Sequence, residues 1–332
     1  MSSAIFNNIE HNKEFEKLCR LDKKRLKNYL IERLNMQHGD GWCYREGTFP
    51  VLLTAHMDTV HKKQCKRITY FRNTAGQVVT TSPEGIGGDD RCGIYMALKI
   101  LEKVDCSVLF CEDEEVGSIG AGKFVKTELC ESLKGKFKYI IELDRANDHD
   151  AVFYEDDNKD FHEFVTKEFW KETWGSWSDI CKLSPALEIS SVNLSCGYYK
   201  AHTTSEFVVL DEMEKSIEEA VKLLNRTDVN AEPFKFIKQV YKYVGAYSNR
   251  NSRLWDYEDY YGGSYYRYGY NSKKIENNEL EDDDDDEMIL EVMLTTGEEL
   301  MITGKTTDEC WKNFFFENTT ICAEEICDYW FI

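Results

Sequence analysis

The sequence lacks any apolar run long enough to cross a membrane. No stretch of its 332 residues approaches the roughly 20 apolar residues that a membrane helix needs. The first residues, MSSAIFNNIEHNKEFEKL, also lack the basic and then apolar pattern of a secretory signal. We therefore expect a cytoplasmic protein without a membrane partner.

Positive charge is scarce as well. The chain has 41 Lys and Arg against 61 Asp and Glu, a formal net charge of −20 at pH 7. Nucleic-acid backbones bind to basic surfaces, so this balance argues against a nucleic acid as the main partner. The Tyr-rich stretch 255–270 could resemble a stacking surface, but it lacks the interleaved basic residues that such binding needs.

The 12 cysteines show no C-x-x-C pair and no regular spacing. Zinc fingers and disulfide frameworks both depend on such spacing, so neither is indicated. We expect most of these cysteines to be reduced and buried as small apolar side chains.

Short apolar runs alternate with helical patterns through the first two thirds of the chain. The runs PVLLTAH, CSVLFC and FKYIIEL read as strands, and helices are expected over 14–34, from Arg91, over 121–133 and over 211–224. This alternation predicts an α/β fold with a mostly parallel sheet. We assign residues 1–230 to this domain.

The composition changes after this domain. Residues 231–287 contain the Tyr-rich stretch and the acidic block EDDDDDE at 281–287, so we expect a linker or irregular segment. Residues 288–332 are predicted to form a small C-terminal α+β unit, a hairpin turning at Thr296-Gly297 followed by a helix.

Histidine and acidic residues follow two of the predicted strands directly. PVLLTAH ends in His56, with Asp58 two residues later, and FKYIIEL is followed by Asp144. Open parallel sheets place their ligand sites at these strand ends. An H-x-D pair such as His56 and Asp58 is, however, also common by chance.

Further candidates lie in turns and loops. GIGGDDRCG places Asp89 and Asp90 where a helix begins, and two acids there could simply cap the helix. Four acids, 112–115, follow the strand CSVLFC, where a solvated loop is the alternative, and His202 lies in the loop GYYKAHTTSE. Each feature is ambiguous alone, but their order and positions together indicate a metal site.

Two zinc ions roughly 3.5–4 Å apart need a bridging carboxylate, further His and carboxylate ligands, and open positions for water and substrate. Asp89 can bridge the two ions. His56 and Asp144 would complete one ion's protein ligands, and Glu115 and His202 the other's. We expect two divalent ions, Zn²⁺ first, with Co²⁺ or Mn²⁺ as alternatives.

Two more acids are predicted to take part in catalysis without binding metal. Asp58 could accept the second N–H of the His56 imidazole and fix its tautomer. Glu114, next to the ligand Glu115, is then free to act as the general base.

The segments AHMDTVH, GGDDRCG, EDEEVG, ELD and GYYKAHTTSEF resemble, in this order, the motifs of the co-catalytic zinc exopeptidases. This clan contains peptidase T, the deep-pocket aminopeptidases and the amino-acid deacylases. The similarity runs from about Val51 to Leu224. It implies a doubly wound α/β domain with helices on both faces of the sheet, and a cis peptide bond between Asp89 and Asp90.

The sequence departs from several members of this clan in one respect. Members with a lid or dimerisation domain carry a long insertion, whereas here Asp89 lies 33 positions after His56 and His202 lies 58 positions after Asp144. We therefore expect the compact form without a lid, and substrate contacts drawn from a lid are in doubt. Ser178, Asp179 and Lys200 lie near pocket positions of the family, although packing or surface roles fit them equally.

The main hypothesis is hydrolysis of a peptide bond near a free amino terminus of a short peptide. Glu114 would take a proton from the attacking water and pass it to the leaving amine. One alternative is an N-acyl amino acid or another small amide as substrate, since pocket shape fixes that choice. A second alternative is a binding or interaction protein that keeps the peptidase fold, with the acidic, Tyr-rich region as its working surface. The sequence does not predict the oligomeric state.

Overall fold

The computed structural model describes residues 11–226, 232–239, 288–294, 299–304 and 326–331. The chain divides into two compact units, Met1–Tyr241 and Lys242–Ile332. The Tyr-rich stretch, the acidic block and the helix predicted after the C-terminal hairpin lie outside the described residues. Within them, no helix is both long and apolar enough to span a bilayer.

The first unit is built on an eight-stranded sheet with the order β1-β2-β6-β3-β7-β10-β8-β9. Its strands are β1 (Gln37–Gly39), β2 (Trp42–Arg45), β3 (Phe49–His56), β6 (Cys106–Cys111), β7 (Tyr139–Arg145), β8 (Asp150–Val152), β9 (Lys171–Glu172) and β10 (Ser191–Ser195). The four central strands, β6, β3, β7 and β10, run parallel, while β1 pairs antiparallel with β2, β2 with β6 and β8 with β10. The mostly parallel α/β sheet expected from the alternation is confirmed.

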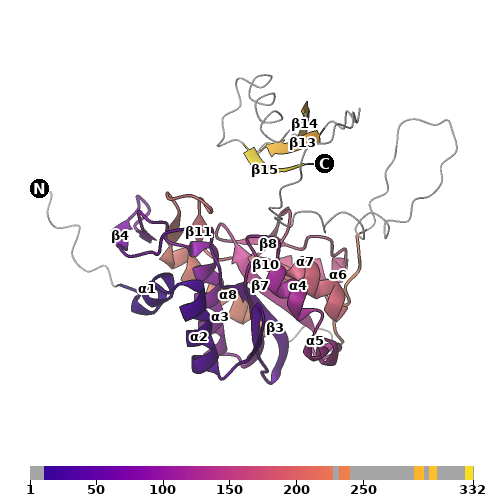
Figure 1. The fold of residues 1–332 in the computed structure, drawn as a ribbon. Coiled ribbons are helices and arrows are strands. Elements are labelled where there is room, and N and C mark those ends of the chain that lie inside the picture. The colour runs from indigo at the N-terminus through magenta and orange to yellow at the C-terminus, as the bar shows by residue number, and fades with distance from the viewer. Residues whose placement is uncertain (1–10, 227–231, 240–287, 295–298, 305–325, 332) are drawn as a thin grey trace, which may run out of the picture. The chain divides into compact units, whose positions relative to one another are not determined.

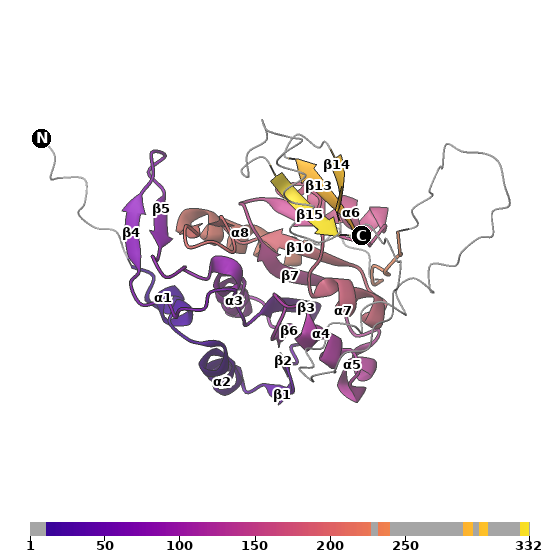
Figure 2. The ribbon, with the colours of Figure 1, turned by 45° about the horizontal axis from the view of Figure 1, so that its top comes forward.

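Helices cover both faces of this sheet (Figures 1 and 2). They are α1 (Lys13–Cys19), α2 (Lys23–Leu34), α3 (Gly88–Leu101), α4 (Ile119–Phe124), α5 (Glu128–Leu133), α6 (Lys159–Thr166), α7 (Ile180–Leu187) and α8 (Leu210–Leu224). Successive strand residues point to opposite faces. Leu53 accordingly joins a core with α1, α3 and α8, while its neighbour Leu52 joins a second core with α4, α5 and α7.

Two predicted helices are each divided in two, because capping side chains start a new helix. Asp22 accepts a hydrogen bond from the backbone N–H of Arg25 (2.9 Å) and starts α2 after the short α1. Thr127 accepts one from the N–H of Cys130 (3.1 Å) and starts α5 after α4. Such side chains satisfy N–H groups that a helix start leaves unpaired.

A glycine lets α3 approach the sheet closely. A Cβ atom at Gly93 would collide with the carbonyl oxygen of Leu143 in β7. Because Gly93 has none, the first turn of α3 lies against the strand that carries Asp144. Asp89, at the start of α3, is thereby brought to the carboxyl ends of the parallel strands.

A smaller sheet adds a loop to the same end of the unit. Its order is β11-β12-β5-β4, with β4 (Thr69–Arg72), β5 (Val78–Thr81), β11 (Tyr198–Tyr199) and β12 (Phe207–Val209). The loop between β11 and β12 contains His202. Since β12 pairs antiparallel with β5, which precedes α3, this loop lies close to the start of α3.

Residues 232–239 pack onto the first unit. Phe234 is buried, with its ring 5.1 Å from that of Phe161 and 6.3 Å from that of Tyr139, between ring centroids. Its carbonyl accepts a hydrogen bond from the N–H of Ser190 (2.8 Å). This segment, predicted as part of a linker or irregular segment, contributes Phe234 to the hydrophobic core of the first unit.

The described part of the second unit is a three-stranded antiparallel sheet, β14-β13-β15. Its strands are β13 (Met288–Leu294), β14 (Glu299–Gly304) and β15 (Ile326–Phe331). The pairing of β13 with β14 matches the predicted hairpin, whereas β15, which pairs with the other edge of β13, was not predicted.

Candidate metal centre

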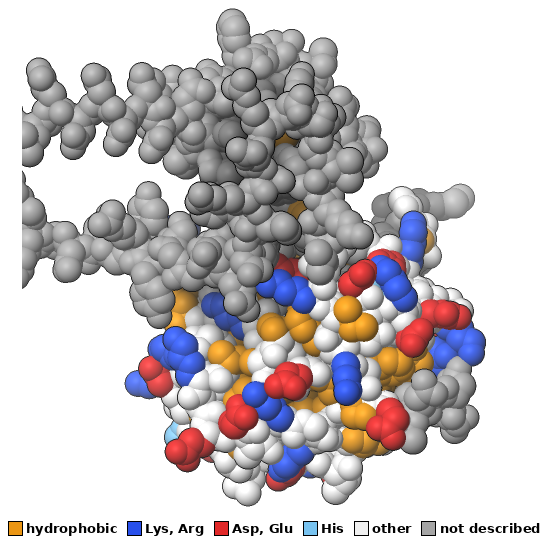
Figure 3. All heavy atoms as spheres, turned by 90° about the vertical axis from the view of Figure 1, so that its right-hand side faces the viewer, with side chains coloured by type: hydrophobic (Ala, Val, Ile, Leu, Met, Phe, Trp, Pro, Cys, Tyr) orange, Lys and Arg blue, Asp and Glu red, His pale blue; other side chains and the backbone are white. Residues whose placement is uncertain are grey.

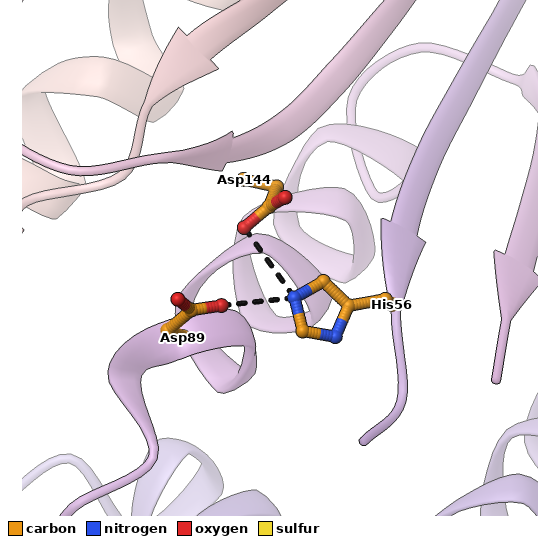
Figure 4. A group of neighbouring side chains, drawn as sticks. All are labelled: His56, Asp89 and Asp144. Atoms are coloured by element: carbon orange, nitrogen blue, oxygen red, sulfur yellow. Dashed lines mark hydrogen bonds and ion pairs between the residues drawn. The ribbon is translucent and has the colours of Figure 1, made fainter. Parts of the chain in front are cut away.

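Three side chains from different elements meet at the end of the parallel sheet. His56 is the last residue of β3, Asp144 lies in the neighbouring strand β7, and Asp89 lies at the start of α3. His56 Nε2 is 2.9 Å from Asp89 Oδ1 and 3.4 Å from Asp144 Oδ1, so both carboxylates face the same imidazole nitrogen (Figure 4). Strand pairing and the close approach of α3 produce this group.

A second group shares Asp89 with the first. His202 Nε2 lies 3.1 Å from Asp89 Oδ2 and 3.0 Å from Glu115 Oε2. Asp89 therefore presents one carboxylate oxygen to each group. Within each group the ligand atoms lie within 4.8 Å of one another. The five residues predicted as ligands thus lie in these two groups, while their role as metal ligands stays a prediction.

Asp58, just after β3, links the end of that strand to the loop that follows β6. Its Oδ1 is 3.4 Å from Nδ1 of His56. Its two carboxylate oxygens also accept the backbone N–H groups of Glu114 (3.1 Å) and Glu115 (3.3 Å). Asp58 therefore lies where it can orient the imidazole, and it also fixes the backbone of both glutamates.

The adjacent acids Asp89 and Asp90 point in different directions. Asp90 is fully buried and accepts the N–H of Gly93 (2.9 Å) at the start of α3 and that of His56 (3.0 Å) at the end of β3. The helix-capping alternative thus holds for Asp90, while Asp89 faces the site. The peptide bond between them is cis, as the family resemblance implied.

Glu206 is a site residue that we did not predict. It is fully buried and accepts the N–H groups of Gly87 (2.8 Å) and Asp89 (3.0 Å), and its Oε2 lies 2.8 Å from Nε2 of His61. It therefore holds the glycine-rich turn that presents Asp89. An acid four residues after His202 was the only signal in the sequence, and strand pairing alone brings it to residue 89.

Other acids crowd the centre from the side of β7. Glu142 is buried two residues before Asp144 in β7, and Asp179 is fully buried at the start of α7. Burial and the neighbouring carboxylates raise the pKa of Glu114 to about 9 and those of Asp144 and Asp179 to about 6. So many carboxylates in one place favour cations among them.

The donor set fits divalent metal ions. Imidazole nitrogens and carboxylate oxygens are the ligands that zinc takes in catalytic sites. In the metal-free protein, protonated histidines supply positive charge among these carboxylates. Hydrogen bonds to Asp89 and Glu115 raise the pKa of His202 to about 11, and despite burial the charge of Asp144 raises the pKa of His56 well above its ordinary value. Imidazolium thus replaces part of the positive charge that the carboxylates require.

The remaining family positions have different surroundings. Ser178 Oγ donates to Asp144 Oδ2 (3.1 Å), and Tyr198 Oη donates to its Oδ1 (3.3 Å), so both hydroxyls orient this carboxylate. Lys200 is exposed and belongs to neither group. Neither carboxylate oxygen of Asp179 has a hydrogen-bond partner among the described residues.

Comparisons with known proteins give the fold. No protein-family model matches the chain, and no curated protein matches it in sequence. Among solved structures it is similar to the aminopeptidase PepT from Bacillus cereus ATCC 10987, with a TM-score of 0.50 and 14% identity over 64% of this chain and 96% of that one. A tripeptidase from Staphylococcus aureus (TM-score 0.49, 13% identity, 63% and 95% covered) and a Zn-dependent exopeptidase from Parabacteroides distasonis ATCC 8503 (0.43, 14%, 63% and 94%) also match. The chain therefore shares the fold of an aminopeptidase, which confirms the fold implied by its resemblance to the co-catalytic zinc exopeptidases.

Proposed function

We propose that the protein is a metal-dependent hydrolase that cleaves a peptide or amide bond, most simply as an aminopeptidase acting on short peptides. The observation that carries this proposal is that Asp89 belongs to both groups. Two adjacent metal ions require one such shared carboxylate. His56 and Asp144 would hold one ion, and Glu115 and His202 the other. Bound there, two divalent ions would supply Lewis-acid polarisation of the scissile carbonyl and lower the pKa of water.

Glu114 is the candidate general base. Its side chain is half-buried, and its backbone is fixed by Asp58. In this role it takes a proton from the attacking water and passes it to the leaving amine, so that it ends the cycle in its starting state. The raised pKa in the metal-free protein favours proton uptake, and bound cations would lower that pKa toward the working range.

A deacylase that removes the acyl group from an N-acyl amino acid would use the same residues. The choice between the two substrate classes depends on the walls of the pocket rather than on the metal ligands. The site itself supports both.

A metal assay combined with a substrate screen tests the proposal. Purified full-length protein is loaded with Zn²⁺, Co²⁺ or Mn²⁺, its bound metal is measured by mass spectrometry, and aminoacyl, dipeptide, tripeptide and N-acyl substrates are compared. We expect about two ions per chain and turnover that chelation abolishes. A protein that none of these metals can load, or one that is loaded and hydrolyses no substrate, would instead support a binding protein with a peptidase fold.

A further inference from the structure

One segment of this acidic chain is distinctly basic. Residues 59–83, which follow Asp58 directly, contain five basic residues and no acidic one, although the whole chain has a net charge of −20. The basic residues are Lys62, Lys63, Lys66, Arg67 and Arg72. On the face of the molecule that Figure 3 shows, by contrast, acidic and basic side chains are interspersed.

The start of this segment lines a cavity beside the candidate metal centre. The cavity has a volume of about 590 Å³, and its walls include Asp58, Glu115, Lys62, Lys63 and Arg91. Ligand sites of proteins usually measure roughly 300–1,000 Å³. Because Glu115 belongs to one of the ligand groups, a molecule bound at the metal centre can extend into this cavity.

The acids that line the cavity already have partners. Asp22 lies 3.4 Å from Arg25, and Asp113 forms an ion pair with Lys23. Asp58 and Glu115 face His56 and His202 in the candidate metal centre. These four carboxylates are therefore not available to neutralise further cations.

Three cations of the cavity have no such partner. Arg91 is only 3% exposed, and its guanidinium donates to the carbonyl oxygens of Met57 (3.0 Å), Asp58 (3.3 Å) and Leu21 (3.3 Å). These three hydrogen bonds use only part of the five N–H donors of the guanidinium and do not cancel its charge. Lys62 and Lys63 are exposed, and across the described ranges none of the three lies within ion-pair distance of a carboxylate.

We propose that this cavity binds a carboxylate of the substrate, with Arg91 as the buried cation and Lys62 and Lys63 at the rim. The inference rests on the proposed function, because the carboxylate belongs to a molecule whose scissile bond lies at the metal centre. Its source is either the free C-terminus of a short peptide or an acidic side chain. In both cases the cationic walls also attract the anionic substrate from solution.

The test compares charged and neutral forms of the same substrate. On the loaded full-length enzyme, kcat/KM is measured for short peptides with a free C-terminus, for their C-terminal amides, and for amides that carry Glu or Gln as a side chain. The variant Lys62→Gln/Lys63→Gln keeps Arg91, which we leave unchanged because its removal would leave three buried carbonyls unpaired. We expect this variant to lower kcat/KM for the preferred carboxylate form by about 5- to 10-fold through KM, with little change for the amide.

A control variant removes the same charge elsewhere. Lys103→Gln/Lys171→Gln changes two exposed lysines, one after α3 and one on the edge strand β9, and should leave all substrates unaffected. A preference for the free C-terminus or for the Glu side chain identifies the source of the carboxylate. Turnover of neutral amides at the same rate as carboxylates, unaltered in the lysine variant, would overturn the inference while leaving the proposed function intact. A metal-loaded enzyme that hydrolyses none of these substrates contradicts the proposed function itself.

Discussion

The carboxylate of Glu206 accepts the backbone N–H of Asp89 over 3.0 Å. Asp89 is the residue that the two candidate ligand groups share, and Glu206 comes from the loop that also carries His202. The same carboxylate accepts the N–H of Gly87. One buried side chain thus links the residue that the two candidate groups share to the loop that carries His202, a predicted ligand.

Replacing Glu206 by Gln should weaken metal binding. Gln has the same size but only one acceptor oxygen, whereas Glu206 accepts through both of its oxygens. We expect zinc affinity to fall by roughly 10- to 100-fold, and the free energy of unfolding of the metal-free protein to fall by about 1–3 kcal/mol. Zinc competition against a chelator and urea denaturation measure both effects. Glu131→Gln, at an exposed position, is the control, and unchanged zinc affinity in Glu206→Gln would contradict the positioning role.

The neighbours Glu114 and Glu115 should respond differently to the same substitution. Glu115 faces His202, whereas Glu114 belongs to neither ligand group. Glu114→Gln should keep near-normal zinc content while activity falls by roughly 10²- to 10⁴-fold, since only the base is lost. Glu115→Gln should weaken one metal site, with activity partly restored by added zinc. Loss of metal from Glu114→Gln, with both ions retained by an inactive Glu115→Gln, would show that the two roles are reversed.

Metal binding should strengthen as the pH rises. Hydrogen bonds to Asp89 and Glu115 raise the pKa of His202 to about 11, so this imidazole is protonated in the metal-free protein at pH 7 and must lose its proton to bind a metal. Each proton displaced should increase the apparent zinc affinity about tenfold per pH unit below that pKa. Calorimetry in buffers of different ionisation enthalpy counts the released protons. Zinc binding without proton release between pH 6 and 8 would exclude the two imidazoles as ligands.

Replacing Asp179 by Asn should stabilise the metal-free protein at neutral pH. Burial raises the pKa of Asp179 to about 6, so folding opposes its ionisation. This unfavourable contribution is absent below the unfolded pKa of about 4, grows as the pH rises toward 6 and is then constant. We expect the variant to gain about 1–3 kcal/mol at pH 7 and little at pH 4. Denaturation curves at both pH values measure this, and an equal gain at both would rule out the ionisation as its cause.

A chain that ends at Tyr241 should bind metal as the full-length protein does. All five predicted ligands lie in the first unit, and residues 232–239 pack onto it. A chain that ends at Asn230 loses Phe234, and burial of an aromatic ring is worth about 3–5 kcal/mol. We therefore expect a clearly lower melting temperature for the shorter chain. Phe234→Ala in the full-length protein should lower the melting temperature by a comparable amount. Zinc content, measured for the chain that ends at Tyr241, tests whether that chain keeps its metal site.

The sequence by itself predicted the candidate ligand residues and determined the elements that carry them. The ends of strands can be predicted from the sequence because the apolar runs that form the strands stop abruptly. His56 and Asp144 lie at the ends of two such runs. Parallel strands bring their carboxyl ends to one edge, so residues far apart in sequence are predicted to meet there.

Only the tertiary structure decided which polar residues support this centre. Glu206 and Arg91 look like ordinary charged residues in the sequence, because their importance comes from burial and from partners more than 30 residues away. The pairing of β12 with β5 brings Glu206 to the turn before α3, and no local pattern encodes that register. Long-range packing likewise places Arg91 beyond ion-pair distance of every described carboxylate and against carbonyl oxygens instead. Local periodicity thus predicts elements and their ends, whereas the neutralisation of buried charges is settled by long-range packing.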